Sequence, residues 1–197
     1  MNTELYTTQN ARWPQSGRHI LAHYDAETVV VYQAYCPQIG RFAAEHGYFG
    51  GPFSLSRMSW IKPNFLWMMY RCGWATKENQ EVVLAVSLRR EAFDRLLTDA
   101  VPSTFDPALY ANEADWKQAL AASDVRLQWD PDHDPGGGKV ERRALQLGLR
   151  GTALTRYARE WIVAIEDVTD FVREQCPHAL SGDWKHLRTP TERTYPG

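Results

Sequence analysis

Residues 57–74, RMSWIKPNFLWMMYRCGW, carry the densest mixture of cationic and aromatic side chains in the chain. Met58 to Lys62 alternates like a strand. Lys62-Pro63 is a typical helix entry, because proline at the first helical position loses no hydrogen bond. A strand that ends on Trp60 and Lys62 just before a helix N-terminus makes a cationic corner rich in backbone N–H groups. Such a corner suits a phosphate or a nucleotide.

Two further predicted strands also end in polar side chains. The segment ETVVVYQAY, residues 27–35, is rich in β-branched residues and places Gln33 and Tyr35 on one face. Because its early residues are apolar on both faces, we expect it to be central in its sheet. The segment VRLQWD, residues 125–130, alternates strictly and carries Gln128 and Asp130 on its polar face. Three such strand ends predict one shared cleft.

The elements that must position these side chains are strands and helices mixed without a regular βαβ rhythm, which predicts an α+β fold. The helix that follows Lys62 is expected to be buried over Phe65 to Met69. Residues 131–138, PDHDPGGG, predict a mobile surface loop and a candidate lid. Other strands are predicted at 81–88, 142–149 and 161–165, and helices at 37–46, 90–97, 114–122, 152–160 and from about 169 to 175.

Length and composition predict one domain over residues 1–197, since a single core is normal up to about 250 residues. Residues 1–17 are expected to form a loosely ordered arm unless Arg12 and Trp13 dock on the body. Residues 177–197 are expected to be a polar tail that runs over the surface. The formal net charge of -2 gives no global attraction to nucleic acid, so a polyanion must meet a local patch. The oligomeric state is left open.

Several classes of chemistry find no motif in the sequence. The six histidines lack metal-ligand spacing, so no metal is expected, and no GxSxG motif is present. The glycines at 136–138 do not open a helix after a strand, which excludes Walker and Rossmann loops. Three cysteines without CxxC spacing are typical of reduced thiols, and no apolar run reaches the length of a membrane span. We therefore expect a cytoplasmic protein with no membrane partner.

Five segments resemble the blocks of a known family, domain of unknown function 4291, and cover most of residues 12–173. They are VYQAYCPQIG, RMSWIKPNFLWMMYRCGWATK, VRLQWDPDHDP, RRALQLGLRG and WIVAIEDVTDFV. The chain is more distantly similar to the ADP-ribosyltransferase fold, which includes the RNA 2'-phosphotransferases. That resemblance implies two small mixed or antiparallel sheets that form a central cleft with flanking helices, and NAD bound in the cleft as a substrate.

The same resemblance implies roles for individual residues. Gln33 stands where Arg or His is expected, and Asp130 stands where the acid is usually Glu. A carboxylate there stabilises the oxocarbenium-like transition state as nicotinamide leaves. The catalytic candidates are Gln33, Tyr35, Gln128 and Asp130. The candidates for binding NAD, by ring stacking or by contact with its pyrophosphate, are Arg12, Arg57, Ser59, Trp60 and Lys62.

We therefore expect an NAD-dependent ADP-ribosyltransferase, a transferase that modifies a protein or nucleic-acid acceptor. Gln33 cannot supply the charge of Arg or His, which affects catalysis more than nucleotide binding. Two alternatives stay open: a non-catalytic nucleotide- or RNA-binding module on the same fold, and RNA 2'-phosphotransferase-like activity. The binding module is suggested by a mixture of cationic and aromatic side chains that suits base stacking with phosphate contacts. These residues are Arg57, Trp60, Lys62, Trp67, Arg71 and Trp74.

Overall fold

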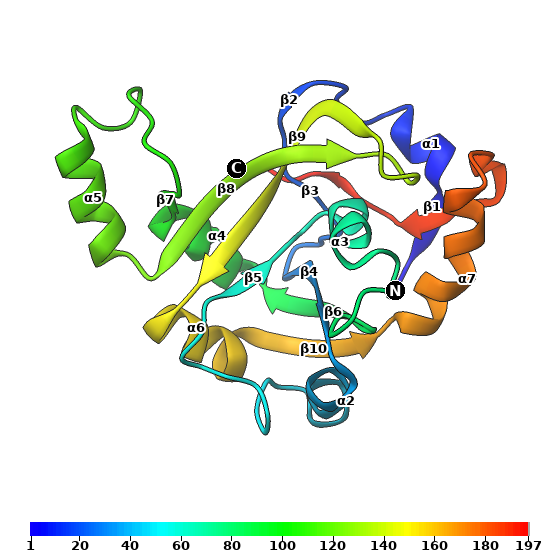
Figure 1. Cartoon of the computed structure of the whole chain (residues 1–197), viewed down its shortest axis with the longest axis horizontal. Helices are drawn as coiled ribbons and strands as arrows, with labels where there is room; N and C mark the ends of the chain where they lie inside the picture. Colours follow the sequence, from blue (N-terminus) through cyan, green and yellow to red (C-terminus); the bar gives the residue numbers. More distant parts are fainter. Residues whose placement is uncertain (197) are drawn as a thin grey trace.

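Two sheets form the framework of the fold, and the computed structural model describes residues 1–196 of the chain (Figure 1). The smaller sheet is antiparallel, in the order β10 (Ile162–Asp167), β6 (Val82–Arg89) and β4 (Thr28–Tyr35). The larger sheet is built on the long antiparallel hairpin of β8 and β9. Its strands are β2 (Gly17–Arg18), β9 (Lys139–Leu149), β8 (Val125–His133) and β7 (Val101–Pro102), with β5 (Ser59–Ile61) also paired to β9. The predicted α+β class is confirmed.

The two sheets are connected through β4 and β5 at an isolated backbone bridge. Tyr32 N–H donates to the Lys62 carbonyl at 2.7 Å, and Lys62 N–H donates back at 3.3 Å. The prediction that β4 is central in its sheet is wrong, because β6 takes the middle position. The strand is apolar on both faces for another reason. Val29 and Val31 pack into one hydrophobic core, and Val30 and Tyr32 pack into a second core on the opposite face.

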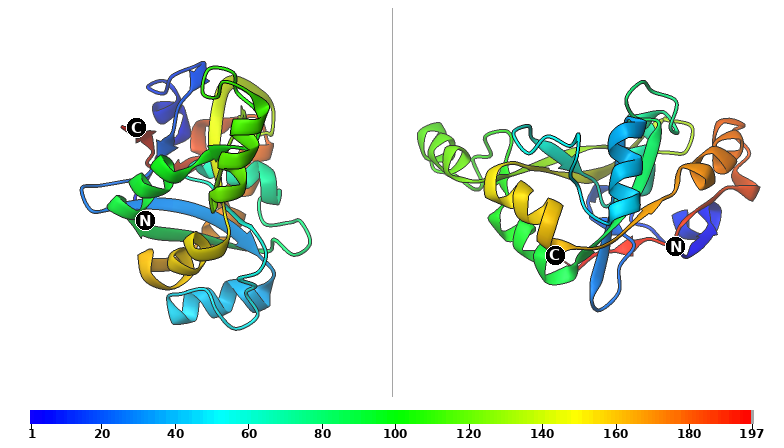
Figure 2. Two further views of the ribbon diagram at one scale, coloured as in Figure 1. Left: turned by 90° about the vertical axis from the view of Figure 1, so that its left-hand side faces the viewer. Right: turned by 90° about the horizontal axis from the view of Figure 1, so that it is seen from below.

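Most of the helices lie around these sheets, as the two views of Figure 2 show, whereas α3 contacts β4 of one sheet and β8 of the other. The predicted helix at 152–160 changes form along its length: it is α-helical as far as Arg156 and π-helical from Tyr157 to Trp161. The last α-helix runs to Leu180 and so passes beyond the expected end near 175. The α-helices are α1 (Tyr6–Asn10), α2 (Pro37–His46), α3 (Phe65–Cys72), α4 (Arg90–Asp99), α5 (Glu113–Ala122), α6 (Gly151–Arg156) and α7 (Thr169–Leu180). Within residues 1–196, no helix has the length and apolar character needed to cross a bilayer.

Helix α3 is buried, as predicted, and lies at the centre of the molecule. Five consecutive residues from Phe65 to Met69 have at most 7% of their surface exposed. Asn64 caps the helix by accepting a hydrogen bond from Trp67 N–H at 2.7 Å. Gly73 ends it in the left-handed conformation, with φ of 58°.

The prediction of a mobile surface loop at residues 131–138 is wrong for the first half of that segment. Strand β8 continues to His133, because Asp132 forms a buried ion pair with Arg142 of β9 at 2.7 Å. The His133 ring stacks on Tyr70 of α3, with 3.5 Å between centroids. The turn that remains is closed by Asp134, whose carboxylate accepts from Gly138 N–H at 2.8 Å. Residues 131–138 therefore form the end of the β8–β9 hairpin, and these contacts hold it in place.

Both ends of the described chain are built into the body, so the prediction of a tail that runs over the surface is wrong, and the exception attached to the prediction of a loose arm applies. Strand β1 (Thr3–Leu5) pairs with β11 (Arg188–Pro190), and β12 (Arg193–Thr194) pairs with β3 (Leu21–Ala22). Trp13 is buried and donates from its indole nitrogen to the Glu192 carbonyl at 2.9 Å. The condition attached to the arm prediction is thus met by Trp13.

Glu192 ties the C-terminal segment to the start of α3. Its Oε1 accepts from Phe65 N–H at 2.7 Å, and its Oε2 accepts from Asn64 Nδ2 at 3.3 Å. Burial raises the pKa of Glu192 well above its ordinary value. A side chain far along the chain therefore satisfies one of the free amides at the N-terminus of α3.

We predict that Glu192→Ala lowers the free energy of unfolding by about 1–3 kcal/mol, because the buried amides of Phe65 and Asn64 then lose their acceptors. Urea denaturation of the wild type and the variant measures this difference. Glu45→Ala, an exposed change on α2, is the matched control and should stay within about 0.5 kcal/mol. Equal stability of the two variants would show that Glu192 does not hold the helix start.

Candidate functional site

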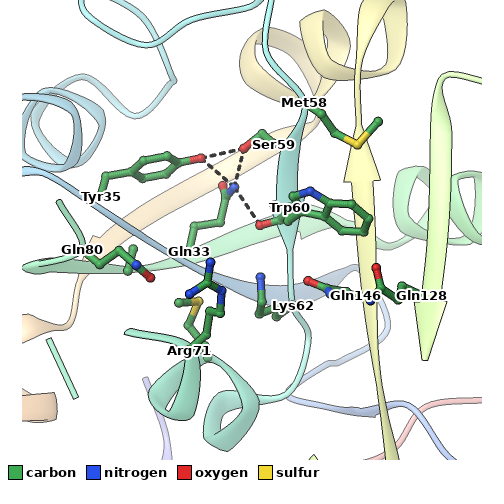
Figure 3. Close-up of a pocket in the computed structure, with 12 residues that line it drawn as sticks. Gln33, Tyr35, Met58, Ser59, Trp60, Lys62, Arg71, Gln80, Gln128 and Gln146 are labelled. Carbon is green, nitrogen blue, oxygen red and sulfur yellow. Dashed lines mark hydrogen bonds between the residues drawn. The ribbon is translucent and has the colours of Figure 1, made fainter. Parts of the chain in front are cut away.

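A cleft of about 430 Å³ opens where the ends of β4 and β5 face the β8–β9 hairpin, next to α3 (Figure 3). We call it the main cleft. The three predicted strand ends all contribute to it, through the pairs Gln33 with Tyr35 and Trp60 with Lys62, and through Gln128. The full lining is Gln33, Ala34, Tyr35, Met58, Ser59, Trp60, Lys62, Met68, Arg71, Gln80, Gln128 and Gln146.

Gln33 is buried and its amide is held in one orientation. Its Nε2 lies 3.2 Å from the Trp60 carbonyl oxygen, which can only accept, so the nitrogen must face that side. Its Oε1 accepts from the Tyr157 hydroxyl at 2.6 Å. Tyr157 is fully buried and comes from the π-helical turn. Sequence reasoning missed Tyr157, because an expected regular α-helix gave no reason to point this residue at β4.

Counting hydrogens shows that this cluster has one donor left over. The two Nε2 hydrogens of Gln33 face three acceptors: the Trp60 carbonyl, the Tyr35 hydroxyl at 2.7 Å and the Ser59 hydroxyl at 2.8 Å. Tyr35 and Ser59 are themselves 2.7 Å apart, so one hydroxyl donates to the other. Whichever of them donates, the second keeps a hydrogen with no acceptor among residues 1–196. Both hydroxyls border the main cleft, which therefore offers a donor to a ligand.

Lys62 and Arg71 bring two positive charges to the main cleft, and Figure 3 shows both pointing into it. Within the described residues, neither side chain has a hydrogen bond or an ion pair. Lys62 is only 4% exposed, and burial together with the nearby charge of Arg71 lowers the pKa of Lys62 to about 8. Asp130, which does not line the cleft, acts on the pKa of Lys62 in the opposite direction. Two adjacent cations that form no ion pair with a carboxylate suit an anionic ligand.

Asp130 is not among the residues that line the cleft, and its carboxylate is held by two amides. Gln128 Nε2 donates to one oxygen at 2.9 Å, and Gln146 Nε2 donates to the other at 2.7 Å. Gln128 and Gln146 are directly opposite each other in the β8–β9 register. Gln146 was not among the predicted site residues, but pairing the two predicted strands would have found it. The residues that line the main cleft include no carboxylate.

Trp60 supplies an aromatic surface to the cleft. It is paired with Gly148 of β9, and a Cβ atom at Gly148 would come within 3.0 Å of the indole ring. The absence of a side chain at Gly148 therefore lets the ring lie close against the sheet. Arg71, which the sequence suggested only for the binding-module alternative, also lines the cleft, and so does Gln80, which sequence reasoning did not assign to the site.

Two of the predicted binding residues lie outside the main cleft. Arg12 is exposed and forms an ion pair with Glu4 at 2.6 Å. Arg57 borders a neighbouring cavity of about 380 Å³, which we call the side chamber. The side chamber is lined by Tyr35, Cys36, Ile39, Phe53, Ser54, Arg57, Met58, Ser59 and Asn79.

The chain matches the model of a known protein family. The model of a family described as Domain of unknown function (DUF4291) matches residues 19–195. That range contains every residue that lines the main cleft and the side chamber. A search of the curated proteins returned no match.

We predict that Lys62→Met raises the free energy of unfolding at pH 7 by roughly 2–3 kcal/mol, because the folded state then no longer buries a charge. The depressed pKa of Lys62 means that the unfolded chain binds one more proton than the folded chain between about pH 8 and 10.5, the ordinary pKa of a lysine. Wild-type stability therefore rises over that window, and the advantage of the variant should vanish above it. Denaturant titrations at several pH values measure both effects.

The matched control is Lys117→Met, which changes an exposed lysine on α5 and should shift stability by no more than about 0.5 kcal/mol. A lower free energy of unfolding for Lys62→Met at pH 7 would show that the charge of Lys62 does not destabilise the folded state.

Proposed function

The chain belongs to the DUF4291 family, and from that premise we propose that it binds NAD or a related nucleotide in the main cleft and transfers ADP-ribose to an acceptor. One observation carries the proposal: Lys62 and Arg71 face the same cleft, and within residues 1–196 neither side chain forms an ion pair with a carboxylate. A pyrophosphate supplies two negative charges to such a pair and accepts charge-assisted hydrogen bonds.

The other walls of the main cleft suit the remaining parts of a dinucleotide. Trp60 and Tyr35 offer ring faces or edges to nicotinamide or adenine. The amides of Gln80 and Gln128 and the spare hydroxyl hydrogen of Tyr35 and Ser59 offer partners for ribose hydroxyls and for the nicotinamide carboxamide. The cleft of about 430 Å³ is in the usual range for small-molecule sites.

The arrangement of the strands also supports an ADP-ribosyltransferase-like fold. Two small sheets meet at β4 and β5, and the side chains just beyond their bridge face a common opening. The strands that carry Gln33, Ser59 and Gln128 follow in the order expected of that fold. Gln33 in place of the usual Arg or His remains a departure from it.

In the proposed reaction, the bond between ribose C1' and the nicotinamide nitrogen breaks, and nicotinamide leaves as a neutral molecule with the bonding electrons. The acceptor nucleophile forms the new bond to C1', and any proton that it carries passes to solvent water. The Asp130 carboxylate stabilises the positive charge that develops on the ribose. Gln128 and Gln146, which hold that carboxylate, fix its position.

A specific observation favours one alternative, a binding module without catalysis on the same fold. Both oxygens of Asp130 already accept hydrogen bonds, and this carboxylate is not among the cleft-lining residues. In this alternative the nucleotide binds over Lys62 and Arg71 and is not consumed.

We predict that wild-type protein binds NAD and ADP-ribose in calorimetric titrations, and that Lys62→Met and Arg71→Gln each weaken binding about tenfold or more. Arg173→Gln, an exposed change on α7, is the control and should have no effect. Affinity should fall above pH 8 by up to about tenfold per pH unit, because Lys62 must be protonated to hold the pyrophosphate. Failure of both ligands to bind the folded wild type would refute the proposal.

We predict that Asp130→Asn abolishes release of nicotinamide from labelled NAD while NAD still binds. The reason is that asparagine keeps the size of the side chain but removes the negative charge that stabilises the transition state. Chromatographic measurement of free nicotinamide, run beside calorimetry on the same preparation, separates catalysis from binding. Wild-type turnover in the variant would exclude Asp130 as the carboxylate that stabilises the transition state, and binding without turnover in the wild type would favour the binding module.

A further inference from the structure

We propose that the side chamber is the acceptor half of a two-part site, and that it takes a phosphorylated nucleoside at the end of a single-stranded nucleic acid. This inference rests on the proposed function, since it places the acceptor beside the nucleotide in the main cleft. It goes further by choosing nucleic acid over protein as the acceptor.

The first step is that the two cavities adjoin. Tyr35, Met58 and Ser59 line both of them, so the pair of hydroxyls stands on the boundary between the main cleft and the side chamber. The hydroxyl hydrogen that has no acceptor among residues 1–196 belongs to this same pair. A ligand that reaches this boundary therefore finds a hydroxyl donor, which suits an oxygen atom of a ribose or a phosphate.

The second step is the charge of the side chamber. Arg57 is the charged residue of its lining, and no carboxylate is present among the lining residues. Within the described chain, the Arg57 guanidinium has no ion pair or hydrogen bond, and it is exposed. The amide of Asn79 and the hydroxyl of Ser54 add neutral polar groups. Such a lining favours an anionic group and disfavours a lysine or arginine side chain from a protein acceptor.

The third step is the apolar part of the side chamber. Phe53 lies edge-on to Tyr35 with 5.8 Å between centroids, and Ile39 adds an aliphatic surface. An aromatic wall beside a lone arginine suits a base that stacks while its phosphate is neutralised. The volume of about 380 Å³ is enough for a single nucleoside and far too small for a folded partner, so we expect a flexible strand end to enter.

The experiment is fluorescence anisotropy with short single-stranded RNA and DNA that carry or lack a terminal phosphate, with the label at the other end. We expect the phosphorylated strands to bind wild type, and Arg57→Gln to bind them roughly tenfold more weakly. Asn79→Gly should also weaken binding. That position has φ of 62°, which glycine adopts freely, so this variant removes the amide without straining the backbone. Arg173→Gln is the matched control and should bind as wild type does.

Calorimetry with ADP-ribose on the same variants separates the two proposals. Unchanged affinity of Arg57→Gln for ADP-ribose supports the side chamber as an acceptor site, whereas an equal loss would overturn it and assign the chamber to the nucleotide. Arg57-dependent binding of the strand by a protein that does not bind NAD supports the chamber and refutes the proposed function. Equal strand binding by Arg57→Gln and Arg173→Gln, or binding of a phosphopeptide in place of the strand, would overturn the inference.

Discussion

The structure depends on the short contact between β4 and β5, where Tyr32 and Lys62 exchange two backbone hydrogen bonds. It connects the sheet of β10, β6 and β4 with the sheet of the β8–β9 hairpin. Beyond it no ladder continues between the two strands, so the side chains of Gln33 and Ser59 fill the space that backbone pairing would otherwise close. A longer ladder here would leave no room for the main cleft.

The position of Lys62 in this bridge explains a cost that the fold carries. Its backbone is fixed by Tyr32, so its ammonium group is held in a largely buried place beside Arg71. Burial and repulsion both disfavour its charge, which is the pattern expected where a protein gives up stability to keep a binding group in place. A bound anion in the cleft would offset both the cost of burying the Lys62 charge and its repulsion from Arg71.

Some features of the site could be predicted from the local sequence pattern, and others could not. Gln33 with Tyr35, and Gln128 with Asp130, were predictable because strand alternation fixes which side chains share a face. The role of Tyr157 was not, because a π-helical turn breaks the period from which its direction would be read. Arg57 was assigned with Lys62 because they are close in sequence, but the structure places it in the neighbouring cavity. The burial of Asp132 and His133 depends on Arg142 of the opposite strand, whose partner no periodic pattern identifies. The burial of the tail depends on Gln9, whose Oε1 accepts from Glu192 N–H across 183 positions of the chain.

The cap that Glu192 places on α3 also orders events in folding. The bond from Phe65 N–H spans 127 positions of the chain, so the entropy of closing that long loop must be overcome before the cap can form. Contacts of such high sequence separation form slowly. A chain emerging from the ribosome therefore has all the residues of the main cleft before it has the carboxylate that anchors the helix beside it. The helix that borders the main cleft therefore gains this cap only after residue 192 has been synthesised.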